Sequence, residues 1–365
     1  MPPVSKRIGI LTYRGENGFI DAGFLRRMVY EGKRLGAEVF LFGPQDVELS
    51  ERRIRGFTPC ANGWRSERYG WPDIVIDHYR YYPVPKHRLY LPFRKRQWFR
   101  YANSRFTNKY RVHQILEQDE ALNRWLPHTA AYSPEALADL LEKHRIVYLK
   151  PTTGTGGRSI LRIERGKQGY SLHGRTRDQR KSTQKLGTIA ALNRAIESWM
   201  EREKQGREQF FLQQGLELSL VPGRTVDARM LVQKDGTGEW KITGMGMRIG
   251  PPQSSTSNLH GGGKAIQAAL FLTRTFGELR AKQIIEECRD LALLAVKRIE
   301  EHFGQMMEFG LDVGIDVRGS VWLIEMNPKP GREIFRQLGQ LDRYRLAVRR
   351  PLEYAMYLLN AEGQQ

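Results

Sequence analysis

The feature of this sequence that most narrows its fold is an apolar run that ends in a lysine, a loop rich in glycine and threonine, and a second strand-like run: VYLKPTTGTGGRSILRIER, residues 147–165. The alternation of apolar and polar residues on both sides predicts two β-strands joined by the loop. Small residues let backbone N–H groups approach an anion, and Lys150 can place its charge on a phosphate. These residues alone fit both a phosphate-binding loop and a hairpin connection beside a chance lysine.

Two common phosphate-binding motifs do not match this loop. A P-loop reads GxxxxGK[ST], whereas here Gly157 is followed by Arg158 and Ser159, and no glycine stands five residues before it. The dinucleotide fingerprint GxGxxG opens a helix, whereas this loop precedes a strand. Any phosphate site here must therefore be of another kind.

The first hundred residues predict a small open α/β domain. RIGILTY reads as a buried strand, GFLRRMVYEGKRLG as an amphipathic helix and AEVFLFGP as a second strand, which together form a βαβ unit with parallel strands. WPDIVIDHY adds a further strand, after which Asp77, His78, Tyr79 and Arg80 either line a cleft or form a turn.

Strands and helices also alternate in the rest of the chain. We expect helices after residue 105, the strand–loop–strand above and another helix, then the strands FFLQQGLELS, TVDARMLVQ and GEWKITGMGMRIG. A long helix over about 278–303, a hairpin GLDVGIDVRGSVWLIEMNPKPG and a closing helix RYRLAVRRPLEYAMYLLN follow. The predicted class is α/β (α+β), with domains at 1–104, 105–208 and 209–365.

The chain is strongly basic, with 59 Lys plus Arg against 40 Asp plus Glu and a formal net charge of +19. Such an excess attracts anions, so nucleotides, nucleic acid and acidic polymers are all candidate partners, while a solvated basic face is the alternative. The basic residues gather in 87–111 and 173–185. The aromatic residues near the first cluster fit either a stacking surface or a core covered by arginine stems; they are Tyr81, Tyr82, Trp98, Phe99 and Tyr101.

The sequence lacks the features of membrane-spanning proteins, of proteins with a signal peptide, and of zinc or disulfide-rich proteins. It has no apolar run of 18 residues, and its first residues lack the features of a signal peptide, so we expect no membrane insertion and a cytoplasmic location. Two distant cysteines, Cys60 and Cys288, argue against structural zinc and a disulfide framework.

The C-terminal hairpin carries a candidate magnesium site. Asp312 lies on its first strand, and Glu325 and Asn327 lie two apart on the second, so the latter two face the same side. Hard oxygen ligands of this kind suit Mg²⁺. A charge within VWLIEMN is costly unless paired, so a neighbouring arginine is the alternative partner of Glu325. Asp316 reads as a turn residue.

Six segments in order resemble the ATP-grasp superfamily, with the greatest likeness to the YheC/YheD family, the endospore coat-associated proteins of spore-forming bacteria. They are TNKYRVHQIL…LPHT, YLKPTTGTGGRSI, FFLQQGLEL, DARMLV, GMRIG…NLHGGG and GLDVGIDVRGSVWLIEMNPKPG, and they span about residues 100–345. The resemblance implies a two-lobed ATP-grasp fold preceded by a small open α/β (pre-ATP-grasp) domain, with ATP and Mg²⁺ as cofactors.

The resemblance also implies roles for individual residues. Lys109 and Lys150 match two ATP lysines, Gln213 would meet the adenine edge although many relatives have glutamate there, and Glu217 is either a ribose contact or a surface residue. The full ATP set is Lys109, Lys150, Thr152, Thr153, Gly154, Gly156, Gly157, Ser159, Gln213, Gln214, Leu216 and Glu217, and the magnesium set is Asp312, Glu325 and Asn327.

Four further residues match positions near the reacting groups. Arg229 and Arg248 would approach the γ-phosphate or the acyl intermediate, although an ion pair with Asp227 is the alternative for Arg229. Asn258, with Gly261–Gly263, would lie near the transferred phosphate, and Arg332 would meet a substrate carboxylate.

The function that the resemblance implies is ATP-dependent ligation of a carboxylate to an amine, thiol or other nucleophile through an acylphosphate. The lack of a Ser-His-Asp or Cys-His set is consistent with this, because such an enzyme supplies placement and charge neutralisation. The alternatives are a non-catalytic ATP-binding or structural spore-coat protein, and a binder of nucleic acid or another anionic polymer.

Overall fold

The computed structural model describes residues 6–16, 18–81, 84–105, 108–153, 157–204, 208–252, 257, 259 and 262–361. Within these ranges the strands form three large sheets, one after another along the chain, and a small ribbon of β2 (Arg14–Gly15) and β3 (Gly18–Phe19). The predicted boundary at 104/105 lies between the N-terminal and middle sheets, whereas the one at 208/209 lies just before β14 (Phe210–Gln214), which is still a strand of the middle sheet. The α/β class is confirmed.

The N-terminal sheet has the order β5-β6-β4-β1-β8, with β7 paired to β6. β1 pairs in parallel with both β4 and β8, and the chain crosses from β1 to β4 through α1, so the predicted βαβ unit is confirmed. The elements of this part are β1 (Arg7–Leu11), α1 (Ala22–Arg34), β4 (Glu38–Phe42), η1 (Pro44–Asp46), β5 (Val47–Glu48), β6 (Arg53–Cys60), β7 (Gly63–Gly70), β8 (Ile74–Asp77), η2 (Pro85–His87) and α2 (Tyr90–Lys95).

The middle sheet is antiparallel, in the order β13-β12-β11-β10-β14-β9. Helices α5 and α6 cover one of its faces through a core that includes Leu140, Leu149, Leu161 and Trp199. The elements are α3 (Lys109–Glu117), α4 (Glu120–Asn123), β9 (Thr129–Ala131), α5 (Pro134–Lys143), β10 (Ile146–Pro151), β11 (Ile160–Gly166), β12 (Gly169–Arg175), β13 (Lys181–Leu186), α6 (Ile189–Glu203) and β14 (Phe210–Gln214). The predicted strand–loop–strand is the hairpin of β10 and β11.

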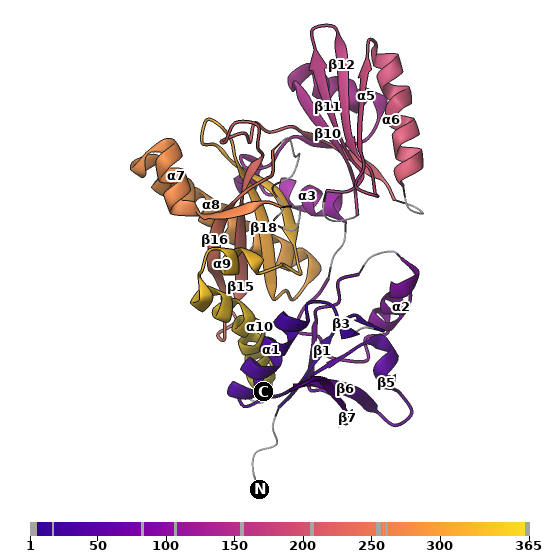
Figure 1. Ribbon diagram of the computed structural model, residues 1–365, viewed down its shortest axis with the longest axis vertical. Helices are drawn as coiled ribbons and strands as arrows, with labels where there is room; N and C mark the ends of the chain where they lie inside the picture. The colour runs from indigo at the N-terminus through magenta and orange to yellow at the C-terminus, as the bar shows by residue number, and fades with distance from the viewer. Residues whose placement is uncertain are drawn as a thin grey trace.

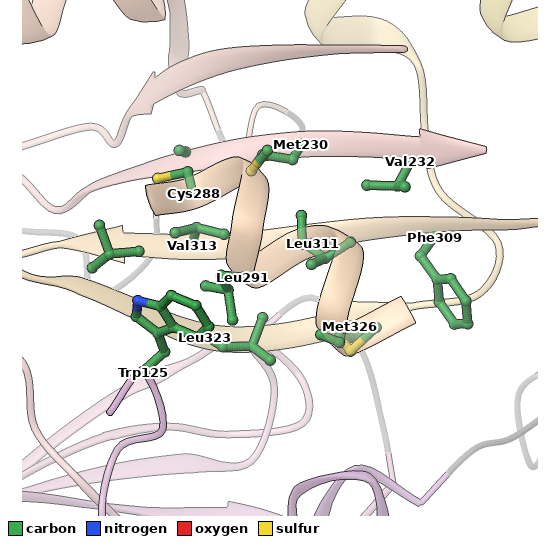
Figure 2. Packing of buried hydrophobic residues seen from close by; sticks show 14 of the residues in the cluster. Trp125, Met230, Val232, Cys288, Leu291, Phe309, Leu311, Val313, Leu323 and Met326 are labelled. Carbon is green, nitrogen blue, oxygen red and sulfur yellow. The ribbon is translucent and has the colours of Figure 1, made fainter. Parts of the chain in front are cut away.

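The C-terminal sheet has the order β17-β16-β15-β18-β19 and is also antiparallel. Figure 2 shows how Cys288 and Leu291 of the long helix lie over Leu311, Val313 and other apolar residues of the sheet. The elements are β15 (Val226–Lys234), β16 (Trp240–Ile249), β17 (Lys264–Gln267), α7 (Ala268–Phe276), α8 (Glu278–Phe303), β18 (Glu308–Ile315), β19 (Val321–Asn327), α9 (Glu333–Gln337) and α10 (Leu341–Ala361).

Helix α10 joins the first and last parts of the molecule. Its Leu352 and Ala355 share a core cluster with Leu25 of α1, Ile8 of β1 and Leu231 of β15. In Figure 1, α10 lies beside α1, between the N-terminal sheet and the C-terminal sheet. The N-terminal sheet is therefore docked onto the same unit that carries the predicted magnesium residues.

Candidate active site between the two later sheets

Three predicted residues from three different elements meet at one place. The Nζ of Lys109, the first residue of α3, lies 3.1 Å from Oε1 of Glu325 on β19. The backbone N–H of Lys109 donates to the carbonyl of Thr152, just past the end of β10, at 2.8 Å. Lys150 of β10 interacts electrostatically with both Lys109 and Glu325. The middle sheet thus supplies a lysine, and α3 a second one, beside a carboxylate of the C-terminal sheet.

The environment of Lys150 destabilises the charged form of its side chain. Burial, with the nearby charge of Lys109, lowers the pKa of Lys150 to about 8, and Glu325 offsets part of this shift. Its Nζ donates to Oε1 of Gln213 at 2.5 Å. Lysines with a lowered pKa are common at functional sites, and a bound anionic ligand would stabilise the charged form of Lys150.

The C-terminal sheet places an arginine–carboxylate row beside these lysines. Arg229 on β15 stands opposite Asp312 on β18, which stands opposite Glu325 on β19. The Nε of Arg229 lies 2.9 Å from Oδ1 of Asp312, and Nη2 of Arg248 lies 3.0 Å from the same oxygen. Arg248 also donates two hydrogen bonds to Asp227, from Nε to Oδ1 at 2.7 Å and from Nη2 to Oδ2 at 2.6 Å. The ion pair considered for Arg229 with Asp227 is therefore made by Arg248, while Arg229 pairs with Asp312.

The predicted magnesium residues share one face of this sheet. Asn327 stands opposite Gly310, two residue pairs along from the Asp312–Glu325 pair and therefore on the same face, so two carboxylates and an amide lie close together. This donor set suits a hard divalent cation. In the described residues no group of three or more His, Cys, Asp or Glu side chains gathers as a metal site, and the set with Asn327 holds only two such residues. Four cationic side chains, Lys109, Lys150, Arg229 and Arg248, face Asp227, Asp312 and Glu325, which leaves a net positive charge for a phosphate chain.

The segment predicted to hold adenine leads from the middle sheet to the C-terminal sheet. Gln213 is buried, accepts from Lys150 and donates to Oγ1 of Thr129 at 3.2 Å. The backbone N–H of Gln214 is already bonded to the carbonyl of His128 at 2.8 Å. The carbonyl of Leu216 accepts from Leu218, and the side chain of Glu217 is exposed. The strand predicted over FFLQQGLELS ends at Gln214.

The glycine-rich loop is described only at its ends. Thr152 is buried, Thr153 donates its hydroxyl to Glu208, and Ser159 donates its hydroxyl to Oε2 of Glu203 at 2.8 Å. Gly157 adopts φ +69°, which favours glycine. Gly154, Gly156, Asn258 and Gly261 lie outside the described residues, so their predicted roles stay predictions.

Three further residues considered from the sequence, Arg332, Asp77 and Asp316, have other partners. Arg332 is buried, and its guanidinium is bonded to Glu308 and to the carbonyls of Pro330 (2.7 Å) and Ala347 (3.4 Å). This geometry gives no support to a substrate contact by Arg332. Asp77 is also buried, bound by Lys329 at 2.7 Å. Asp316 caps a turn through bonds from Arg318, Ser320 and Trp322, as the sequence suggested.

The aromatic residues near the first basic cluster belong to the N-terminal core. Phe99 is buried in a cluster with Phe42 and Phe93, and Tyr81, Trp98 and Tyr101 pack against it. The guanidinium of Arg94 lies over the ring of Tyr101 at 3.3 Å. This is the packed alternative rather than a stacking surface; Tyr82 lies outside the described residues.

The sequence analysis did not identify His113, a buried neighbour of Lys150. His113 lies four residues after Lys109 on α3, and burial together with the charge of Lys150 lowers its pKa to about 4. The i, i+4 spacing puts both side chains on one helix face and was the signal that could have found it.

The chain is similar to several known proteins. The chain is 28% identical to the endospore coat-associated protein YheD of Bacillus subtilis (strain 168) over 92% of this chain and 74% of that protein. It is 23% identical to YheC of the same organism over 94% of each. Among solved structures, D-cycloserine synthetase DcsG shares the fold, with a TM-score of 0.57, 14% identity and coverage of 97% and 99%.

No helix in the described residues is long and apolar enough to cross a bilayer. Residues 98–358 match the family described as YheC/D-like ATP-grasp, and this chain therefore belongs to that family.

Proposed function

We propose that this chain is an ATP-dependent ligase that joins a carboxylate substrate to an amine or another nucleophile. The observation that carries the proposal is the meeting of Lys109, Lys150 and Glu325, which come from α3, the middle sheet and the C-terminal sheet. A partly buried ammonium beside a second ammonium costs free energy, and a bound polyphosphate would offset that cost.

The reaction that fits these groups has two balanced steps. A substrate carboxylate oxygen attacks the γ-phosphorus of ATP, and the bond to ADP breaks, which leaves an acylphosphate. A nucleophile such as an amine then attacks the acyl carbon, phosphate departs, and the proton of the amine passes to a base or to water. The protein needs to supply placement and charge, because the nucleophiles come from the substrates.

The residues of the site divide this work. Lys109 and Lys150 would bind the phosphates, and Arg229 lies beside Asp312, where a transferred phosphoryl group would gather charge. Arg248 is held on both sides by Asp227 and Asp312, so we assign it to orienting Asp312. Asp312, Glu325 and Asn327 would hold Mg²⁺, which when bound neutralises phosphate charge.

The proposal is tested by binding and by product formation. Saturating Mg-ATP should stabilise the native protein by about 2.7 kcal/mol at one hundred times Kd. Glu325→Ala should abolish this shift, whereas Glu333→Ala, which removes an exposed partner of Arg336, should keep it. ADP release and mass change should then be followed with amino acids, peptides and dicarboxylates. Absence of any Mg-ATP stabilisation in the native protein would refute the proposal.

A second candidate is a non-catalytic ATP-binding or structural role in the spore coat. It is favoured by the names of the two relatives, both of which are called endospore coat-associated. The two candidates differ in turnover. Mg-ATP binding without ADP release across the substrate panel, together with recovery of the protein in coat extracts, would favour the second.

A further inference from the structure

The two ends of the glycine-rich loop are tied to the same region of the molecule. Thr153, at the start of the loop, donates its hydroxyl to Glu208, and Ser159, at its end, donates to Oε2 of Glu203 at 2.8 Å. Glu203 is the last residue of α6, and Glu208 follows it in the chain. Ser159 and Glu203 are 2% and 7% exposed, so water competes little for this hydrogen bond.

Arg177 completes this network. Its backbone N–H donates to Oε2 of Glu203 at 2.7 Å, and its guanidinium reaches the carbonyl of Glu203 and, at 3.4 Å, Oε2 of Glu208. Arg177 lies in the connection between β12 and β13. A buried carboxylate is costly without such donors, so the network is specific rather than incidental.

This network lies on the face of the middle sheet opposite to the side chain of Lys150, the lysine proposed to bind phosphate. Helix α6 packs through Ile196 and Trp199 on the face that carries Leu149 and Leu161. Lys150 follows Leu149 directly in the strand, so its side chain points to the opposite face. A hydroxyl also has only one proton to donate, and both loop-end hydroxyls give theirs to carboxylates.

We propose that Ser159 anchors the glycine-rich loop to the end of α6 and Thr153 anchors it to Glu208, just before β14, with Glu203 and Glu208 as positioning residues, and that these hydroxyls are not ATP ligands. The inference rests on the proposed function for the identity of the ligand. Ser159 also adopts a left-handed conformation, φ 56°, which a serine rarely holds without such support. A loop with fixed ends loses less freedom when ATP binds, so the anchors raise affinity without touching the nucleotide.

The test is a double-mutant cycle on Mg-ATP affinity, measured by calorimetry, with Ser159→Ala, Glu203→Ala and the double variant. We expect each single variant to weaken Mg-ATP binding about tenfold and the double variant to be no weaker than Glu203→Ala alone. Adenosine affinity should stay unchanged in all three, because adenosine has no phosphate for the loop to cover. A general loss of fold would lower both affinities together.

A phosphate-donating Ser159 predicts the opposite pattern. Removal of Glu203 would then free the hydroxyl and leave Mg-ATP affinity unchanged or tighter, and Ser159→Ala would still weaken binding in the Glu203→Ala background. Either result overturns the inference. Glu203→Gln keeps the shape and one acceptor and should recover part of the loss, while Glu201→Gln, an exposed carboxylate on α6, is the matched control. If the native protein itself does not bind Mg-ATP, the proposed function fails first, and this inference fails with it.

Discussion

The buried ion pair between Asp77 and Lys329 should be among the most costly contacts of this protein to remove. Asp77 ends β8, and Lys329 lies two residues beyond β19, with Nζ 2.7 Å from Oδ1 and 2.7 Å from the carbonyl of Tyr79. The Asp77 side chain is fully buried, and that of Lys329 is 13% exposed. The pair therefore ties the N-terminal sheet to the strand that carries Glu325 and Asn327.

We take Lys329→Met as the perturbation, because methionine keeps the length of the side chain and removes the charge. Removal of one partner of a buried ion pair costs about 3–5 kcal/mol. Asp77 keeps bonds from the Tyr90 hydroxyl at 2.6 Å and from Nε of Arg94 at 3.1 Å, so we expect the lower end of that range. Asp77→Asn should lower the free energy of unfolding by a similar amount, because it leaves the ammonium of Lys329 without its carboxylate partner.

The assay is a double-mutant cycle on the free energy of unfolding in urea. The double variant should lose about 1–3 kcal/mol less than the sum of the single losses, because neither charge is left alone. Hydrogen exchange at the amides of β8 reports opening of the N-terminal sheet separately from global unfolding. Arg345→Met is the control. The side chains of Arg345 and Asp342 are 69% and 97% exposed, so loss of their ion pair should change the free energy of unfolding by less than about 0.5 kcal/mol.

The pH dependence gives an independent check on this pair. Burial raises the pKa of the Asp77 carboxyl, but Lys329, Tyr90 and Arg94 together hold it below its usual range. Its contribution to stability is therefore present above pH 3.8, the ordinary pKa of aspartate, and is lost as the pH falls through the lower folded value. Asp77→Asn should flatten this acid limb. A loss under about 1 kcal/mol in Lys329→Met, or strict additivity in the cycle, would refute the reasoning.

Two further predictions concern the cationic side chains Lys150 and Arg332. Because the pKa of Lys150 is lowered from 10.5 to about 8, the unfolded chain binds more protons between these values. Stability should therefore rise by up to about 3 kcal/mol across that window while Mg-ATP affinity falls, and both slopes should vanish in Lys150→Met; equal slopes in the two proteins would contradict this. Arg332→Met should cost about 3–5 kcal/mol, because its pair with Glu308 is almost fully buried, and should leave Mg-ATP affinity unchanged. A higher KM for a carboxylate substrate at unchanged stability would instead give Arg332 the substrate role that the sequence suggested.

Local patterns in the sequence predicted the elements well. The parallel βαβ unit, the strand–loop–strand at Lys150 and the long helix Glu278–Phe303 all follow from hydrophobic periodicity. The order of six segments then implied that Lys150 and Glu325 share a site, which no local pattern could show.

The contacts of single polar side chains were beyond the sequence. Arg248 rather than Arg229 pairs with Asp227, because Arg248 stands opposite it on the neighbouring strand. The bond from Lys329 to Asp77 joins residues that no periodicity relates, since it depends on how the N-terminal sheet docks. The carboxylates that hold Thr153 and Ser159 were missed for the same reason.

One irregularity explains how Glu325 reaches the site at all. Asp312 stands opposite Glu325, but Val313 stands opposite Leu323, so Ile324 is an extra residue on β19. With strict alternation, Glu325 would share the face of Leu323, which is buried in the core under α8. The bulge moves Glu325 and Asn327 to the face of Asp312 while Met326 and Leu323 both remain in the core. The residues proposed to bind magnesium therefore depend on one inserted residue. The charge of Glu325, which is costly inside the apolar run VWLIEMN, is directed away from the apolar side chains around it.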